Sequence, residues 1–298
     1  MTITQATPDL ATNSILLLVR IRRLGNRRKV PSAAVEVDAD RDAINVGKEL
    51  LDAPEFKEIV TLDGTIRQWL YGRSLPAYGV LKNSAYRLPL SLVEEVDAYL
   101  EEMQSRRELL LEAFLEVYPS RVQSAKTRLR SLYDPQDYPA VEQVRQAFGL
   151  EYRYLTFGIP ESISAQLMQR ERGKAAADIQ SEVEEIKIAL RTGFAELVAH
   201  AADRLVIKQD GKKVIFKDSM VANMEEFFGY FAARNLVGDQ ELAELVARAR
   251  EAMKGVTAEV LRTDDVTRAS VKATLNQVKD EMDKNLLVRP RRRLILDK

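Results

Sequence analysis

The strongest constraint on the fold is a stripe in the middle of the chain whose members recur at alternating steps of three and four residues. The stripe consists of Val183, Ile186, Leu190, Gly193, Leu197, His200 and Arg204. This spacing places its side chains on one face of an α-helix, so the stripe predicts a coiled-coil-like seam packed against other helices. The surrounding segment, Ala165 to Val206, contains no proline and is predicted to form one long helix.

Several other segments also have helical spacing. Val271, Leu275, Val278 and Met282 repeat the three-and-four pattern within a helix predicted from Thr257 to Leu287. The remaining predicted helices are Ala43–Leu51, Pro54–Ile59, Gly64–Leu70, Ser91–Val117 ended by Pro119, Ser120–Tyr133, Pro139–Phe148, Ser219–Asn235 and Asp239–Met253. We therefore expect long amphipathic helices and a helical bundle in the C-terminal half.

Two segments favour β-strands instead. Ser14 to Leu24 alternates apolar and basic residues most clearly from Val19 to Arg22, and Glu151 to Phe157 is rich in aromatic residues and threonine. Together they predict a small β element. The fold class is therefore mainly α with a small β element.

The length of 298 residues fits two modules of unequal size. We expect a disordered tail over residues 1–13, a mixed α/β module over 14–160, and a helical bundle over 161–288. A β-hairpin is predicted near 204–217, where Asp210-Gly211 is a typical turn pair. Residues 289–298 are predicted to be a basic tail that contains Arg289, Arg291, Arg292 and Arg293.

Composition argues against several catalytic classes. The chain has no cysteine and one histidine, which excludes thiol catalysis, cysteine-based metal sites and a two-histidine metal site within one chain. His200 is the obvious candidate base, but it is accompanied by no nucleophile or metal cluster, so we interpret it as a packed or surface residue near Glu196. Asp38, Asp40 and Asp42 alternate as in an oxygen-ligand loop for magnesium, but the segment lacks the glycine and the closing glutamate of a calcium loop, so we interpret it as a solvated acidic stretch. We expect no catalytic, cofactor or metal site.

The charge is balanced overall, with 45 basic and 45 acidic residues, so any basic site must be local. One basic segment contains six positive charges and no acid: Arg20, Arg22, Arg23, Arg27, Arg28 and Lys29. Such a strand is able to follow phosphates, although no aromatic residue is interleaved for base stacking. The alternative is an edge strand whose charges prevent aggregation.

Trp69 to Tyr78 is predicted to be a loop that docks a protein partner. Trp69, Tyr71, Arg73 and Tyr78 are the residue types that anchor protein interfaces. A packed structural loop is the alternative. With Ile186, Leu190 and Leu197 from the helical stripe, these residues form the predicted interface set.

Several stretches together resemble an uncharacterised bacterial and phage family, domain of unknown function 3150. They are ILLLVRIRRL, TIRQWLYGRSLPAYG, YRLPLSLVEEVDAYLEEM, YPSRVQSAKTRLRSLYDPQDYP, EYRYLTF and IFKDSMVANMEEFF, in order between about Ser14 and Glu251. The family has no assigned activity and defines no functional residues. The resemblance implies an accessory protein of a phage or mobile element, associated with a MoxR-type AAA+ ATPase and a von Willebrand factor A protein.

The sequence therefore predicts a non-enzymatic adaptor that assembles with itself or with a second protein such as that ATPase. The alternative is a phage accessory protein that binds nucleic acid through the basic strand. The apolar run Ile15–Val19 is far too short to cross a bilayer, so no membrane contact is expected and the cytoplasm of a bacterial host is the expected location.

Overall fold

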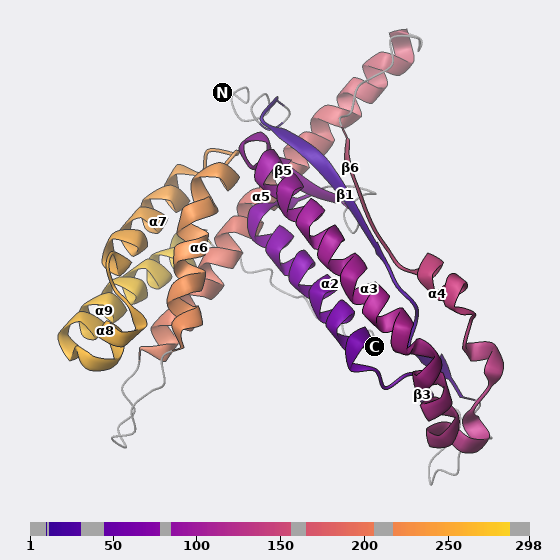
Figure 1. Cartoon of the computed structure of the whole chain (residues 1–298). Helices are drawn as coiled ribbons and strands as arrows, with labels where there is room; N and C mark the ends of the chain where they lie inside the picture. The colour runs from indigo at the N-terminus through magenta and orange to yellow at the C-terminus, as the bar shows by residue number, and fades with distance from the viewer. Residues whose placement is uncertain are drawn as a thin grey trace, which may run out of the picture. The chain divides into compact units, whose positions relative to one another are not determined.

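A computed structural model of the chain describes residues 10, 12–30, 45–77, 85–155, 165–205 and 217–286, with only the backbone described for 165–178, 285 and 286. The fold is mainly helical with a small β element, as predicted (Figure 1). The strands are β1 (Ser14–Arg22), β2 (Arg27–Lys29), β3 (Gly47–Glu49), β4 (Leu75–Pro76), β5 (Ala85–Pro89) and β6 (Gly149–Leu155). The α-helices are α2 (Pro54–Arg73), α3 (Val93–Leu129), α4 (Val141–Ala147), α5 (Ala165–Arg204), α6 (Asp218–Arg234), α7 (Gln240–Met253), α8 (Ala258–Thr263) and α9 (Asp265–Glu281). Short 3-10 turns η4 (Leu90–Leu92), η5 (Arg130–Leu132) and η6 (Pro135–Asp137) and a π-helical turn η7 (Met282–Leu286) complete the described elements.

The chain divides into two compact units. The mixed unit comprises Leu17–Tyr71 and Val93–Tyr154, and the helical unit comprises Met1–Leu16, Gly72–Leu92 and Leu155–Lys298. From the sequence, residues 14–16 and Gly72–Leu92 are placed in the mixed α/β module over 14–160. The structure instead assigns them to the unit that contains the C-terminal helices.

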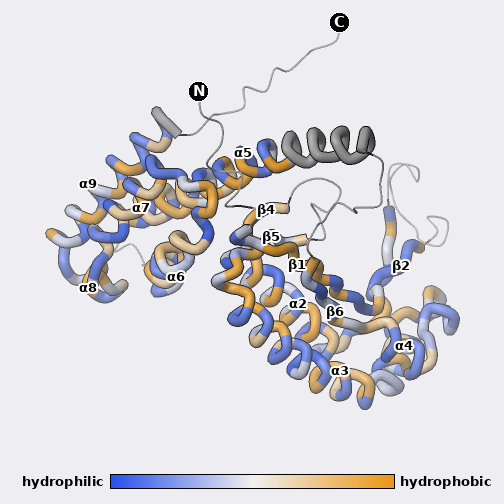
Figure 2. Tube along the Cα trace, turned by 90° about the horizontal axis from the view of Figure 1, so that it is seen from above, coloured by the Kyte–Doolittle hydropathy of each residue, from blue (hydrophilic) through white to orange (hydrophobic). Residues whose placement is uncertain are grey.

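In the mixed unit, α2 and α3 lie side by side and the later part of β1 runs along them next to β6 (Figure 1). Hydrophobic residues recur along both helices between hydrophilic ones (Figure 2). Their core contains Phe56, Phe114 and Phe148, whose ring centroids are 5.6 to 6.2 Å apart. The small antiparallel pair of β2 and β3, with Arg27 opposite Glu49, belongs to this unit.

In the helical unit, α5 packs on α6 and α9, and α7 packs on α6 and α9. Buried side chains from all four helices share one core, which explains why each helix has an apolar stripe. Asp239 caps α7 by accepting a hydrogen bond from the Leu242 amide at 3.2 Å. The short β4 pairs antiparallel with β5, and β5 neighbours the start of β1 in the sheet.

Three element predictions are wrong. Residues 47–49 of the predicted helix Ala43–Leu51 form strand β3. Pro54 to Arg73 is a single helix, so Trp69 and Tyr71 lie in a helix and not in a loop. Helix α3 continues through Pro119, because the proline is exposed while Tyr118 and Ala125 on either side are buried.

The predicted helix Thr257–Leu287 and the predicted hairpin near 204–217 have different outcomes. The long C-terminal helix is divided at Asp264, which caps the start of α9. Residues 206–216 of the predicted hairpin lie outside the described residues, as do residues 1–9, 11 and 287–298. Leu10, within the tail that was predicted to be disordered, is buried in the core of the helical unit. None of the helices that the structure describes is long and apolar enough to cross a membrane.

Candidate functional site

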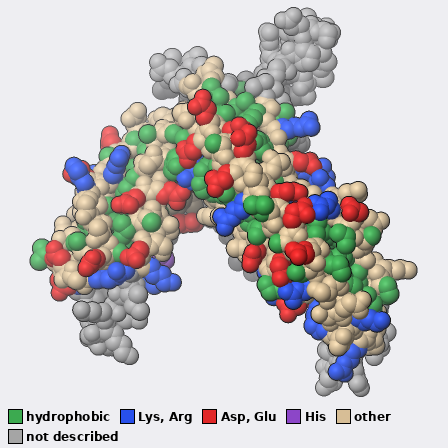
Figure 3. Space-filling model, viewed as in Figure 1, with side chains coloured by type: hydrophobic (Ala, Val, Ile, Leu, Met, Phe, Trp, Pro, Cys, Tyr) green, Lys and Arg blue, Asp and Glu red, His purple; other side chains and the backbone are tan. Residues whose placement is uncertain are grey.

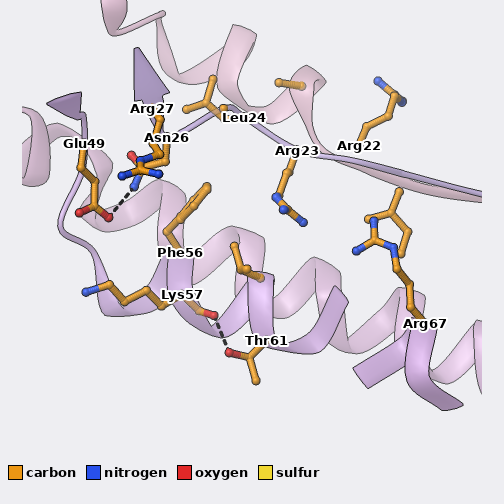
Figure 4. A pocket seen from close by; sticks show the side chains of 14 residues that line it. Arg22, Arg23, Leu24, Asn26, Arg27, Glu49, Phe56, Lys57, Thr61 and Arg67 are labelled. Atoms are coloured by element: carbon orange, nitrogen blue, oxygen red, sulfur yellow. Dashed lines mark hydrogen bonds between the residues drawn. The ribbon is translucent and has the colours of Figure 1, made fainter. Parts of the chain in front are cut away.

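An open groove of about 1040 Å³ lies in the mixed unit, between the extended segment from Ile21 to Arg27 and helix α2. Figure 4 shows this segment passing over the helix, with Arg67 extending from α2 toward it. The apolar part of the lining includes Leu24, Phe56 and Val60. Leu24 and Phe56 belong to the unit's core, so the groove has a packed floor.

The lining of the groove is strongly basic. Five cationic side chains contribute to it, namely Arg22, Arg23, Arg27, Lys57 and Arg67, against the single carboxylate of Glu49. On the face of the mixed unit seen in Figure 3, acidic and basic side chains are interspersed. The excess of positive charge is therefore a local property of the groove.

Arg23 extends from the end of β1 toward α2 and contacts a buried carboxylate (Figure 4). Its Nη1 donates to Asp63 Oδ2 at 3.2 Å, while Arg107 Nε donates to Asp63 Oδ1 at 2.8 Å. Asp63 is fully buried and Arg107 is 4 % exposed. Two guanidinium groups therefore share one carboxylate, which leaves a net positive charge next to the groove, where Arg23 lines it.

Arg22 points away from α2 and is held by β6 and the residues before it (Figure 4). Its guanidinium contacts Glu151 Oε1 at 2.5 Å and donates to the Gln146 carbonyl at 3.1 Å. The hydrogen bond and charge of Arg22 lower the pKa of Glu151. A Cβ atom at Gly149 would lie 2.7 Å from Arg22 Nη2, so glycine at this position leaves room for the guanidinium.

The turn before Arg27 is fixed by Asn26. The Asn26 side chain accepts from the Leu51 amide and donates to the Leu51 carbonyl, both at 2.8 Å, and the Asn26 carbonyl accepts from the Leu50 amide at 2.9 Å. These bonds set the direction in which the chain leaves the groove. None of these three hydrogen bonds involves the Arg27 side chain.

Arg27 and Arg67 are the exposed cations of the groove for which the described residues supply no partner. Both are exposed, and neither side chain makes an ion pair or hydrogen bond within the described part of the chain. Lys57, by contrast, contacts Asp52 at 2.7 Å. Arg27 and Arg67 are thus the groove residues best able to accept an external anion.

The structure brings together only half of the predicted basic segment. Arg22, Arg23 and Arg27 line the groove, whereas Arg20 is exposed on β1 outside its lining. Arg28 lies 3.6 Å from Asp137. Lys29 lines a separate hollow of about 350 Å³ near Lys48 and Asp134.

The predicted docking loop is dispersed. Trp69 stacks on Tyr99 of α3 with ring centroids 3.6 Å apart, whereas Tyr71 is 71 % exposed. Arg73 is buried in the helical unit and contacts Glu226 Oε1 and the Tyr230 hydroxyl, both at 2.9 Å. Tyr78 lies outside the described residues.

The apolar stripe of α5 packs within the chain and changes register after Leu190. Ile186 and Leu190 are buried, and the next buried residues are Phe194 and Val198, while Leu197 is only partly buried against the core. The predicted members Gly193, His200 and Arg204 are exposed. Burial in this core explains the stripe without a second chain.

His200 and the three aspartates were the residues considered for catalysis or metal binding. His200 is exposed on α5, and within the described residues it makes no hydrogen bond or ion pair with Glu196. The same part of the chain holds no cluster of three or more histidine, aspartate or glutamate residues suited to a metal ion. Asp38, Asp40 and Asp42 lie outside it.

Sequence reasoning missed the helical half of the groove. Lys57 and Arg67 lie ten residues apart in α2, which is about 2.8 turns, so their side chains differ by about 80° around the helix axis and can line the same groove. Dividing this segment into two predicted helices concealed the relationship. A continuous helix from Pro54 would have indicated it.

Comparison of the chain with protein-family models, curated proteins and solved structures found no significant match to any of them. The resemblance to the phage family therefore stays a prediction.

Proposed function

We propose that the protein is a non-enzymatic nucleic-acid-binding protein and that the basic groove of the mixed unit binds the phosphate backbone. The observation that carries this proposal is the set of five cations and one carboxylate around an open groove. Local positive charge of this kind binds nucleic acid largely through phosphates.

The exposure of the groove arginines also supports phosphate binding. Arg27 and Arg67 provide exposed guanidinium groups on the two sides of the groove, while Arg23 is held against Asp63. Guanidinium groups bind phosphate oxygens in a bidentate geometry. Phe56, the aromatic residue of the described lining, is buried, so contacts within the groove would be independent of base sequence.

A protein partner is the competing proposal. The helical stripe that motivated it is buried in the chain's own core, which removes Ile186 and Leu190 as support for an interface. Assembly with a second copy or with an ATPase stays a prediction from the sequence. The basic groove therefore supports nucleic-acid binding more strongly than the helical stripe supports a protein partner.

A binding titration with a matched control tests the proposal. Fluorescence anisotropy of labelled single-stranded DNA, duplex DNA and RNA at low salt is measured for the wild type, for Arg27→Glu/Arg67→Glu, and for Arg106→Glu/Arg250→Glu. The control arginines are also exposed and unpaired within the described residues, and they lie outside the groove.

We expect binding in the micromolar range or tighter by the wild type and a loss of about tenfold or more in the groove variant only. Equal losses in both variants would show that only net charge matters. Absence of binding by the wild type, or equal binding of an acidic polypeptide such as polyglutamate, would contradict the proposal.

A further inference from the structure

The face of α2 that lines the groove continues beyond it to an exposed aromatic residue. Val60 and Arg67 line the groove, and Tyr71 follows Arg67 by one helical turn in the same helix. At 100° per residue, Tyr71 is rotated by about 20° from Val60 and by about 40° from Arg67. Tyr71 therefore lies on the groove-lining face, about 6 Å along the axis from Arg67.

The ring of Tyr71 is exposed to solvent. It is 71 % exposed, the highest exposure of any aromatic side chain in the described residues. No hydrogen bond or ring contact to it is made within that part of the chain, whereas Trp69, two residues earlier, is stacked on Tyr99. Packing of the mixed unit does not explain an exposed ring at this position.

An exposed aromatic ring beside an arginine is suited to an unpaired base. Nucleobases stack on tyrosine rings with little dependence on sequence, while the adjacent phosphate contacts arginine. Bases of a duplex are already stacked on their neighbours, so the same ring adds little to duplex binding. A base-stacking role for Tyr71 would therefore favour single-stranded over duplex nucleic acid.

We propose that the groove takes single-stranded nucleic acid, with phosphates at Arg27 and Arg67 and one base stacked on Tyr71. This inference rests on the proposed function and narrows its ligand class. It assigns Tyr71 a binding role that differs from the protein-docking role predicted from the sequence.

The test compares Tyr71→Ala and Tyr71→Phe with the wild type on single-stranded and duplex DNA. Leu109→Ala is the matched control, because Leu109 is 72 % exposed on α3 of the same unit. We expect Tyr71→Ala to bind single-stranded DNA about fivefold or more weakly, with duplex binding unchanged. Tyr71→Phe should retain affinity, since it keeps the aromatic face, and Leu109→Ala should match the wild type.

A second readout follows stacking directly. A fluorescent base analogue whose emission is quenched by stacking should be quenched by the wild type and by Tyr71→Phe but not by Tyr71→Ala. If Tyr71→Ala equals the wild type while Arg27→Glu/Arg67→Glu loses binding, the stacking inference is wrong and the proposed function stands. If the wild type binds neither DNA nor RNA, both are wrong.

Discussion

Arg107 donates from Nε to Asp63 Oδ1 at 2.8 Å in the interior of the mixed unit, where the Asp63 side chain is completely buried. Arg107 also donates to the Arg22 carbonyl at 2.7 Å, so this pair connects α2, α3 and the end of β1. Its guanidinium lies 5.6 Å from the centre of the Phe148 ring. The pair fixes the strand on the helices and thereby fixes one side of the groove.

Replacing Asp63 should therefore destabilise the mixed unit severely. In Asp63→Asn, Arg107 remains buried without its countercharge, which should cost about 3–5 kcal/mol of the free energy of unfolding. Arg23→Gln is the control, because Arg23 is 37 % exposed and leaves the Arg107 pair intact, so about 1 kcal/mol or less should be lost. Urea unfolding measures both values. Similar losses would contradict a special role for the buried pair.

Asp239 should make stability depend on pH. Burial raises its pKa, but hydrogen bonds and charge from Arg191 and the Leu242 amide outweigh burial and lower the pKa below its ordinary value. Its side chain is 2 % exposed and contacts Arg191 at 2.6 and 2.9 Å. Because the pKa is lower in the folded state, the stabilisation is fully present above about pH 4 and is lost as pH falls through the folded-state pKa.

Asp239→Asn keeps the helix cap but removes this charge, so it should cost about 2 kcal/mol at neutral pH. The difference from the wild type should shrink as unfolding is measured at increasingly acidic pH. Glu241→Gln should change little at any pH, since Glu241 is 73 % exposed. A pH-independent difference for Asp239→Asn would show that the charge does not stabilise the fold.

Leu190 should behave as a core residue. It is 1 % exposed in the helical unit, so Leu190→Ala should cost about 2–5 kcal/mol of unfolding free energy without changing the molar mass in light scattering. Ile188→Ala is the control on the same helix, because Ile188 is 59 % exposed, and it should cost less than about 0.5 kcal/mol. Dissociation of an oligomer by Leu190→Ala, with each protomer as stable as before, would place Leu190 at an interface instead.

His200→Gln should leave both stability and nucleic-acid binding unchanged. His200 is exposed on α5 and has no hydrogen bond or ion pair within the described residues. Thermal unfolding and the anisotropy titration check the two properties. A large loss of binding with unaltered thermal stability would give this histidine a functional role.

Local patterns were sufficient to predict much of the fold. The strand pattern of Ser14–Leu24 located β1, and helical spacing over Asp239–Met253 located α7, because in both segments the same residues determine local structure and burial. Pro119 misled the prediction, since local propensity favours a break. Burial on both sides of the proline outweighs the lost hydrogen bond.

The groove was only half predictable from the sequence. The charge run contains Arg22, Arg23 and Arg27, but which of its members remain unpaired depends on distant residues such as Glu151 and Asp63. The α2 side of the groove, with Lys57 and Arg67, forms only because α2 packs next to the end of β1, and the spacing of residues within either segment does not show this packing. The predicted stripe failed after Leu190 for a related reason, because the core selected Phe194 and Val198. The three-and-four spacing is compatible with more than one buried face of α5, and packing against the other helices determines which face is buried.

The most direct test of the central claim is the salt dependence of binding to single-stranded DNA. For the wild type, the logarithm of the association constant should fall linearly with the logarithm of salt concentration, because binding releases counterions from phosphates. Arg27→Gln and Arg67→Gln should each make the slope shallower by about 0.7, and Arg106→Gln should leave it unchanged. A slope that is identical in all four proteins, or an affinity that does not change with salt, would contradict phosphate binding in the groove.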